Sequence, residues 1–202
     1  MKRRIYILIV CLVNTVFFSS CSDWFDVSPK TNVKAEELFE TENGYLSALA
    51  GIYVSMTDAA AYGGNLSFGM MDQLAQSYDM VPTGASDRAT IYTYDVGTDG
   101  YNTKARLAES WKQAYNLIAN ANNLLNWLDK NSENVIRDPE TRNMIYGEAL
   151  AIRAYIHFDL LRGWGPMYHS EPNALSIPYR EVADNSKQPL LPANEVLKRI
   201  LR

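Results

Sequence analysis

The sequence predicts an all-α fold, and three observations support that class. Apolar residues recur at steps of three and four along 104–128 and again along 139–162, which places each set on one face of a helix. The same spacing runs through 35–56. The connector 129–137 is short enough to join the two strongest helices as an antiparallel pair.

Residues 1–20 have the layout of a secretory signal. A cationic start, Lys2 to Arg4, precedes an apolar run that ends at Phe18 and is followed by two serines. The apolar run is too short for a bilayer-spanning helix, which needs ~20 apolar residues. We therefore predict a signal that is removed rather than a permanent membrane helix.

Cys21 indicates which kind of signal this is. Small residues directly before a cysteine are typical of lipoprotein signals, in which the thiol is lipidated and becomes the new N-terminus. Ser19 and Ser20 fit that pattern, whereas Phe18 stands where a smaller aliphatic residue is common. The other cysteine, Cys11, lies in the removed segment, so the mature chain cannot form an internal disulfide. We predict lipid on Cys21; the alternative is an ordinary signal peptide with a coincidental cysteine.

The charge of the mature chain argues against two classes of partner. The whole chain has 19 basic and 23 acidic residues, and removal of the signal leaves 16 basic residues and a net charge of −7. So acidic a chain argues against nucleic acid, whose binding proteins carry a basic surface. It also argues against electrostatic attachment to anionic lipids. Lipid on Cys21 is then the expected membrane anchor, and stable anchoring needs more than one acyl chain.

The first part of the mature chain alternates helices with irregular segments. A polar tether, 21–34, lacks periodicity and contains a proline. It leads into the first helix, 35–56. A break at 59–65 ends in Gly-Gly-Asn, and a short helix is predicted over 66–78. The loop 82–100 is rich in Thr, Gly, Asp and Ser and is too long for a simple connector, which is typical of functional loops.

The helix 139–162 has the clearest end signals. Asp138 is a natural N-cap, and Pro139 suits the first helical position. Gly163 predicts the end of the helix.

The last part of the sequence indicates an interrupted fold. An irregular stretch with several prolines, 172–192, precedes a last helix that starts near Asn194. The sequence stops at Arg202, before that helix has a visible partner for its apolar face. We therefore expect residues 35–202 to be the N-terminal part of a longer helical domain.

Three parts of the chain resemble the SusD/RagB family. Residues 147–166 (GEALAIRAYIHFDLLRGWGP) are similar to its signature helix, which runs Glu-Ala, Arg-Ala, an aromatic pair, Asp-Leu and a Gly-Pro turn. The mature start, 21–29 (CSDWFDVSP), and residues 48–53 (ALAGIY) also resemble the family, and all of these parts occur in the family's order. The resemblance extends from Cys21 to the end of the chain.

The resemblance implies a scaffold of tetratricopeptide-like helix pairs with no catalytic activity. We also expect no cofactor. It implies a lipoprotein on the outer face of the outer membrane that caps a SusC-like TonB-dependent transporter. Such a cap captures glycans or other nutrients and passes them to the barrel. Family members are much longer and take much of their ligand surface from the C-terminal half. The chain is therefore expected to be a truncated SusD-like fold.

Candidate ligand-binding residues lie in and around the loop 82–100. Sugar binding needs flat aromatic faces for the apolar side of a pyranose ring and polar groups for its hydroxyls. We assign that role to residues on either side of the loop and within it, namely Tyr78, Asp79, Tyr92, Tyr94 and Tyr101. The alternative is that these tyrosines pack onto the helices. Because relatives can place tryptophans here, the resemblance does not carry a sugar specificity.

Other chemistry-bearing residues favour structural roles. Arg153 lies in an apolar helix, so we expect a structural ion pair from a neighbouring helix. Trp111, Trp127 and Trp164 are expected to pack rather than bind ligand. The two histidines lie far apart in different elements and have no cysteine partner, so we expect no metal site and no catalytic set.

The leading hypothesis is a surface lipoprotein that binds a glycan or another nutrient and hands it to a SusC-like transporter. A lipid-anchored helical-repeat protein that binds only other proteins is the rival. Stable stacking normally needs three or more repeats, and only about two helix pairs are visible. A non-functional fragment that does not fold stably alone is therefore a third alternative.

Overall fold

The computed structural model describes residues 34–79, 87–94 and 101–202. The predicted signal, Cys21 and most of the predicted tether lie outside these ranges. The described residues contain helices and no β-strand, which confirms the all-α prediction. The helices are α2 (Ala35–Leu38), α3 (Glu42–Met56), α4 (Met70–Leu74), α5 (Asp87–Tyr92), α6 (Tyr101–Val135), α7 (Pro139–Trp164) and α8 (Ala193–Ile200). Helix α2 belongs to a separate compact unit, Met1–Leu38, and the remaining helices belong to the unit Phe39–Arg202.

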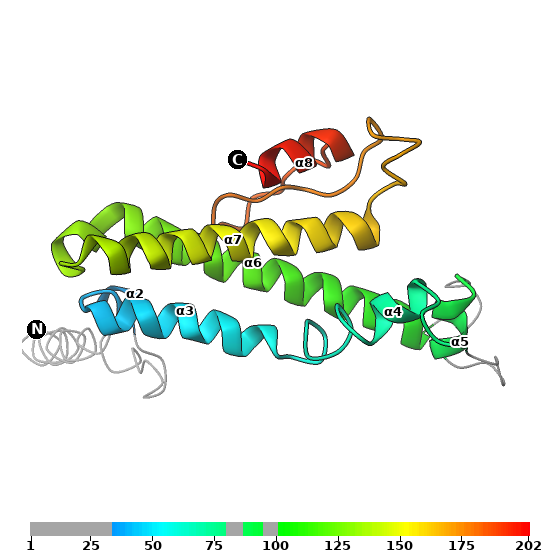
Figure 1. Cartoon of the computed structure of the whole chain (residues 1–202), viewed down its shortest axis with the longest axis horizontal. Coiled ribbons are helices and arrows are strands. Elements are labelled where there is room, and N and C mark those ends of the chain that lie inside the picture. Colours follow the sequence, from blue (N-terminus) through cyan, green and yellow to red (C-terminus); the bar gives the residue numbers. More distant parts are fainter. Residues whose placement is uncertain (1–33, 80–86, 95–100) are drawn as a thin grey trace, which may run out of the picture. The chain divides into compact units, whose positions relative to one another are not determined.

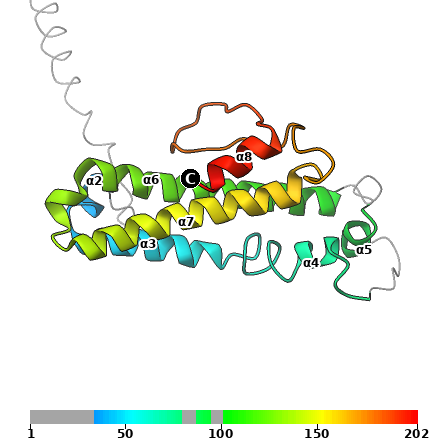
Figure 2. The ribbon, with the colours of Figure 1, turned by 45° about the horizontal axis from the view of Figure 1, so that its top comes forward.

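The centre of the larger unit is the helix pair α6 and α7, with α3 packed against both. Figures 1 and 2 show these three helices running alongside one another, and α8 lying on α7 on the side away from α3. Each fully buried aliphatic side chain contributes about 1.5–3 kcal/mol of burial free energy, so the core holds the bundle together. The largest core side chains are Tyr45 of α3, Leu117, Ile118 and Leu124 of α6, and Ile145, Ile156 and Leu160 of α7.

Helix α6 is longer than the predicted helix 104–128, and the connector 129–137 is correspondingly wrong. The helix continues because Ser132 follows Leu128 on the buried face at a step of four residues, and Ile136, directly after the helix, is buried at the next such step. The Ser132 hydroxyl donates to the Leu128 carbonyl (2.5 Å), which satisfies this buried polar group within the helix. The connector to α7 shrinks to residues 136–138.

Helix α7 starts as predicted and ends later. The Asp138 carboxylate accepts the backbone N–H of Glu140 (3.3 Å) and of Thr141 (3.0 Å), which confirms the N-cap. Gly163 does not end the helix; Gly165 does. A Cβ at Gly163 would stand 3.0 Å from the Met71 methyl carbon, so the glycine permits close contact with α4.

The predicted helix 35–56 is interrupted, and residues 39–41 separate α2 from α3. Thr41 takes an extended conformation, and its hydroxyl oxygen accepts the Gly44 N–H (3.1 Å), which makes Thr41 the N-cap of α3. This local cap competes with continuation of the helix and explains why the prediction was wrong here.

The predicted helix 66–78 is also too long, because α4 covers only its middle. The chain from 57 to 69 forms wide turns, in which the Gly63 N–H bonds to the Asp58 carbonyl and the Asn65 N–H to the Ala59 carbonyl. A Cβ at Gly63 would stand 1.9 Å from the Thr57 carbonyl oxygen, so this path requires glycine.

Two segments predicted as irregular, 82–100 after α4 and 172–192 before α8, differ in outcome. The loop 82–100, predicted as irregular, contains α5; the residues on both sides of α5, 80–86 and 95–100, lie outside the described ranges. The irregular stretch 172–192 and the last helix near Asn194 are confirmed. None of the described helices is long and apolar enough to cross a bilayer.

Candidate functional site

Three of the five predicted ligand-binding residues gather around α4 and α5, in a region that we call the aromatic corner (Phe68, Tyr78, Tyr92 and Tyr94). The Tyr78 hydroxyl lies 2.9 Å from an Asp72 carboxylate oxygen on α4 and 3.3 Å from the Phe68 carbonyl. Its hydrogen bond to the carboxylate raises the pKa of Tyr78. These contacts hold the phenol end while the ring stays exposed.

Tyr94 is also held by its hydroxyl while its ring stays exposed, and its hydrogen bond is shorter. Its hydroxyl donates to the Leu74 carbonyl at the end of α4 (2.6 Å), yet 61% of the residue is exposed. The Tyr94 backbone is left-handed, with φ of 59°, and so is that of Gln76, with φ of 53°. The Gln76 side-chain amide donates to the Tyr92 carbonyl (3.1 Å). Non-glycine residues with a left-handed backbone are strained, and such strain is concentrated at functional sites.

The remaining predicted residues are less informative. Asp79 is exposed and directly follows Tyr78. Tyr101 begins α6, and its side chain lies outside the described part. Sequence reasoning missed Phe68, an exposed ring whose carbonyl lies beside the Tyr78 hydroxyl. A lone aromatic inside a predicted helix gave no signal for it.

A cavity of about 590 Å³ adjoins the aromatic corner, and we call it the α4–α7 cavity. Its volume lies within the ~300–1,000 Å³ of ligand pockets. Leu74 belongs to both sites, because it lines the cavity and its carbonyl accepts the Tyr94 hydroxyl. The walls come from α4 (Met71, Leu74 and neighbouring Ala75), the end of α7 (Phe158, Leu161, Arg162, Gly163), the following turn (Pro166, Met167, Tyr168) and Leu197 of α8.

Among the described residues that line the cavity, Arg162 is the one cation, and its orientation is fixed. Arg162 donates through Nε (3.0 Å) and one terminal nitrogen (2.6 Å) to the same oxygen of Asp159, whose side chain is only 3% exposed. The guanidinium carbon lies 5.8 Å from the centre of the Phe158 ring, within cation–π range. On the other side, burial raises the pKa of Tyr62 far above its usual value, and the charge of Asp159 raises it further.

The cavity residues Phe158, Arg162 and Tyr168 were not predicted as a site. The spacing of Phe158 and Arg162, four residues apart on one helical face, was a usable signal for their pairing. Tyr168 had none, because it reaches the cavity through the turn after α7.

The predicted structural residues behave differently from one another. Arg153 does find its partner on the neighbouring helix, but that partner is an amide, since Arg153 donates to the Asn122 oxygen (3.1 Å). The predicted ion pair is therefore wrong: Arg153 is only half-buried, and a neutral acceptor suffices. The packing roles of the tryptophans are confirmed, because Trp127 stacks on Phe39 (5.1 Å) and Trp111 meets Trp164 edge to face (5.6 Å).

Comparison with known proteins gives consistent matches. The model of the SusD-like family described as "Starch-binding associating with outer membrane" matches residues 23–199. A SusD-like protein of Formosa agariphila is 24% identical over 87% of this chain, and one of Bacteroides ovatus is 23% identical over 96%. The chain spans about a third of the length of these relatives (33% of each).

Solved structures support the same fold. A SusD superfamily protein from Bacteroides thetaiotaomicron matches 80% of this chain and 35% of its own, with a TM-score of 0.66 and 23% identity. A second one, from Bacteroides fragilis, matches 81% of this chain and 38% of its own, with a TM-score of 0.65 and 22% identity. These likenesses establish the fold of the described helices.

Proposed function

The chain belongs to the SusD-like family, and on that basis we propose that it serves in glycan or nutrient capture at the outer membrane. In this proposal lipid on Cys21 anchors the chain on the outer face of the membrane. The ligand is bound without chemical change and is passed to a SusC-like TonB-dependent transporter. The family supports a binding role and the membrane association; the ligand, the anchor and the transporter are our proposal.

The observation that supports ligand binding best is the exposed, fixed ring of Tyr94. Two features restrict its motion. The Tyr94 hydroxyl donates to the Leu74 carbonyl, and the Tyr94 backbone is left-handed. A ring that is already held loses little conformational freedom when a sugar stacks on it. Tyr78 is held by its hydroxyl in the same way, so the corner offers two preorganised aromatic faces.

The α4–α7 cavity extends this surface. Phe158 and Tyr168 keep exposed rings among its lining residues, and Arg162 supplies hydrogen-bond donors beside them. Aromatic faces for the apolar side of a pyranose and a guanidinium for its hydroxyls are a suitable combination. We propose that a glycan longer than one unit contacts both regions across α4.

The glycan proposal is tested by affinity electrophoresis of the full chain in detergent, through gels that contain a panel of polysaccharides. We expect retardation by at least one polysaccharide. Tyr94→Ala should weaken that binding about tenfold, which corresponds to ~1.4 kcal/mol. Tyr53→Ala is the matched control, because Tyr53 is also exposed but lies on α3 and bonds to Glu148. Retardation by no polysaccharide contradicts the glycan proposal, and equal retardation of all three proteins contradicts the assignment to Tyr94.

The anchor is tested separately. Cys21→Ala should move the chain from the membrane fraction to the soluble fraction of cells that process lipoproteins. A mass increase from acyl chains on the N-terminal peptide of the unchanged protein should accompany membrane attachment. Unchanged attachment of Cys21→Ala contradicts the lipid anchor.

A second function, binding only to other proteins, is favoured by the outer faces of α3 and α7. Helix α7 carries apolar residues on every side, and such helices are normally covered on all faces. Yet Val54 of α3 and Met144 and Tyr155 of α7 are exposed. Val54→Glu together with Tyr155→Glu should abolish cross-linking to a co-expressed SusC-like transporter if this surface is the contact. Intact cross-linking removes the support that these faces give to protein binding.

A further inference from the structure

His157 of α7 is completely buried and bonded at both ring nitrogens. Its Nε2 accepts the backbone N–H of Arg180 (3.1 Å), so Nε2 carries no proton. Its Nδ1–H therefore donates to the Arg153 carbonyl one turn earlier in α7 (2.8 Å). The ring is held as one neutral tautomer, with its proton on Nδ1.

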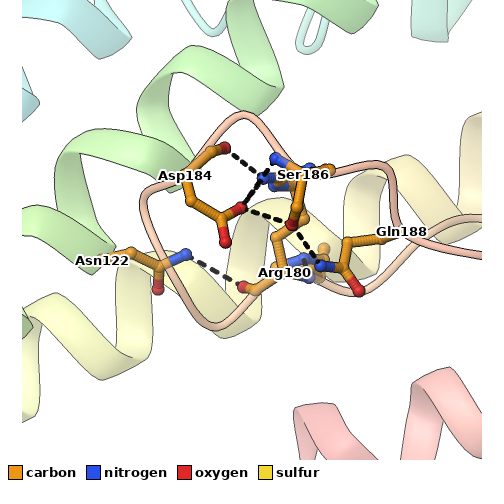
Figure 3. Close-up of polar contacts among 6 residues, drawn as sticks. Asn122, Arg180, Asp184, Ser186 and Gln188 are labelled. Atoms are coloured by element: carbon orange, nitrogen blue, oxygen red, sulfur yellow. Dashed lines mark hydrogen bonds and ion pairs between the residues drawn. The ribbon is translucent and has the colours of Figure 1, made fainter.

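Residues 178–180 are bound to the helix pair around this ring. Tyr179 stacks on His157 with ring centres 4.0 Å apart, and the Tyr115 hydroxyl of α6 donates to the Pro178 carbonyl (2.7 Å). The Asn122 amide of α6 donates to the Arg180 carbonyl (3.0 Å), a contact drawn in Figure 3. We call this cluster (Tyr115, Asn122, Arg153, His157, Tyr179 and Arg180) the polar junction.

The polar junction fixes a longer segment, residues 174–193. Two arms of the segment pair with each other, since the Ser176 N–H bonds to the Leu191 carbonyl (2.8 Å) and the Leu191 N–H to the Ile177 carbonyl (3.1 Å). Between the arms, residues 181–190 form an exposed loop. Figure 3 shows how the loop is closed on itself, with Asp184 and Ser186 converging on Arg180.

The same segment positions α8 and hence one wall of the α4–α7 cavity. The Tyr179 hydroxyl donates to the Arg199 carbonyl of α8 (3.1 Å). Helix α8 begins where the segment ends, at Ala193, and its Leu197 lines the cavity. Release of the segment would therefore loosen that wall.

A proton on His157 would oppose its contact with the Arg180 N–H, although it would keep the bond from Nδ1–H to the Arg153 carbonyl. Protonated Nε2 becomes a donor facing the Arg180 N–H, so a hydrogen bond turns into a clash of two donors. The charged groups around the ring are Arg153 on α7, Arg180 and Glu181 on the segment and Arg199 on α8, whereas Tyr115 and Tyr179 are neutral. Glu181 pairs with Arg199 (3.8 Å), and Asp184 pairs with Arg180 (2.7 Å). Among the described residues, no carboxylate lies within hydrogen-bonding distance of the ring to compensate.

We propose that His157 is an acid-operated latch, whose protonation releases residues 174–193 from α6 and α7 and loosens the α8 wall of the cavity. Its effect on ligand binding rests on the function proposed above; the release itself does not.

The size of the effect follows from the two ends of the titration. Burial, and then the charge of Arg153, lower the pKa of His157 to about 4 from its ordinary 6.5, against the opposing effect of its bond to the Arg153 carbonyl. The open segment therefore takes up the proton at a higher pH than the docked one. Relative to pH 7, the ratio of open to docked segment should rise about 20-fold at pH 5 and about 100-fold at pH 4.

Hydrogen–deuterium exchange of the full chain at pH 7, 5 and 4, corrected for the intrinsic effect of pH, tests the latch without any ligand. We expect peptides from 174–193 to lose protection by these factors while peptides from α6 and α7 keep theirs. His157→Gln keeps an acceptor for the Arg180 N–H but cannot take a proton, so it should lose the response. His169→Gln is the matched control, because His169 is the other histidine and is exposed. It should respond as the unchanged protein does.

Asp184 is the competing acid-sensitive group in the loop. Its hydrogen bonds to Ser186 lower its pKa below the ordinary carboxylate value, so it titrates at a lower pH than the response expected here. Asp184→Asn should therefore keep the change between pH 7 and 5. Loss of that change in Asp184→Asn would overturn the assignment to His157.

Two further results contradict the latch. The first is a response that persists in His157→Gln, or an opening that includes α6 and α7 at the same pH. The second comes from the unchanged protein, in which carbon-labelled histidine rings report protonation directly by NMR. Protonation of His157 without loss of protection in 174–193 rules the latch out, even if His157→Gln proves too unstable to study. Glycan gels at pH 7 test the proposed function independently, so either proposal can fail while the other stands.

Discussion

The aromatic corner and the polar junction contain the same kind of hydrogen bond, but its effect differs between the two regions. In both, a tyrosine hydroxyl donates to a backbone carbonyl of another element: Tyr94 to Leu74 at the corner, and Tyr179 to Arg199 at the junction. At the junction the ring is 6% exposed and stacks on His157, so the tyrosine stabilises the fold. At the corner the ring faces solvent on a left-handed backbone, so the same hydrogen bond presents the ring instead. Whether the ring is buried or exposed, rather than its hydrogen bond, distinguishes a tyrosine that stabilises the fold from one that is available to a ligand.

The sharpest way to break this comparison is to remove the ring from each region. Tyr179→Ala should lower the free energy of unfolding by about 3–5 kcal/mol, because it leaves a cavity against His157 and frees the Arg199 carbonyl. Tyr94→Ala, whose ring is mostly exposed, should change it by less than about 1 kcal/mol. Urea unfolding followed by circular dichroism measures both. Equal losses would mean that the corner ring is part of the core after all.

Acid should separate the two regions next. The folded pKa of His157, about 4, lies below its ordinary 6.5, so the unfolded chain binds a proton that the folded chain does not. Stability from the neutral ring is therefore complete above pH 6.5 and is lost as the pH falls toward 4, by about 3 kcal/mol at pH 4. The difference in unfolding free energy between the unchanged protein and His157→Gln isolates this effect from the carboxylates. A difference that does not change with pH contradicts it.

A smaller effect is expected from the amide at the centre of the junction. Asn122→Leu leaves the Arg180 carbonyl and the Arg153 guanidinium without this partner, which should lower the free energy of unfolding by about 1–3 kcal/mol. Asn134→Leu is the control, because Asn134 lies on the same helix but is exposed. The shift in urea midpoint between the two variants measures the contribution, and equal midpoints would show that the amide contributes nothing.

The smallest effect is expected at the strained backbone of the corner. Gln76→Gly removes the backbone strain of the left-handed conformation, which costs the folded state ~1 kcal/mol. The same change increases the conformational entropy of the unfolded chain and removes an exposed hydrogen bond, and both effects destabilise the folded state. The net change in unfolding free energy should stay within about 0.5 kcal/mol. If the strain serves ligand binding, glycan retardation should weaken in this variant although its melting temperature does not move. Retardation equal to that of the unchanged protein would contradict the hypothesis that the strain serves ligand binding.

The long helices could be predicted because their signals are local. The periodicity of α6 and α7 and the Asp138 cap depend on residues within a few positions of one another. The wide turns around Gly63 could not be predicted, since they depend on carbonyls five and six residues away rather than four. The same limit explains why α4 proved shorter than the helix predicted over 66–78.

Sites were predictable only as far as their residues were close in sequence. Tyr78, Tyr92 and Tyr94 were recognised as one group because they lie in or beside one long loop that is rich in polar residues. The contact of His157 with Arg180 spans 23 positions, and that of Arg153 with Asn122 spans 31. No local pattern encodes such pairs, because the first forms when residues 174–193 pack on α7 and the second when α6 packs on α7.

The contact between Trp111 and Trp164 offers an optical reporter. Two indoles 5.6 Å apart at an interplanar angle of 65° have electronic transitions that couple, which produces a paired circular-dichroism signal in the ultraviolet. One indole belongs to α6 and the other to the last turn of α7, beside residues that line the α4–α7 cavity. The amplitude of the signal therefore reports the seating of that turn. Changes caused by a ligand in the cavity are thereby observable without any label.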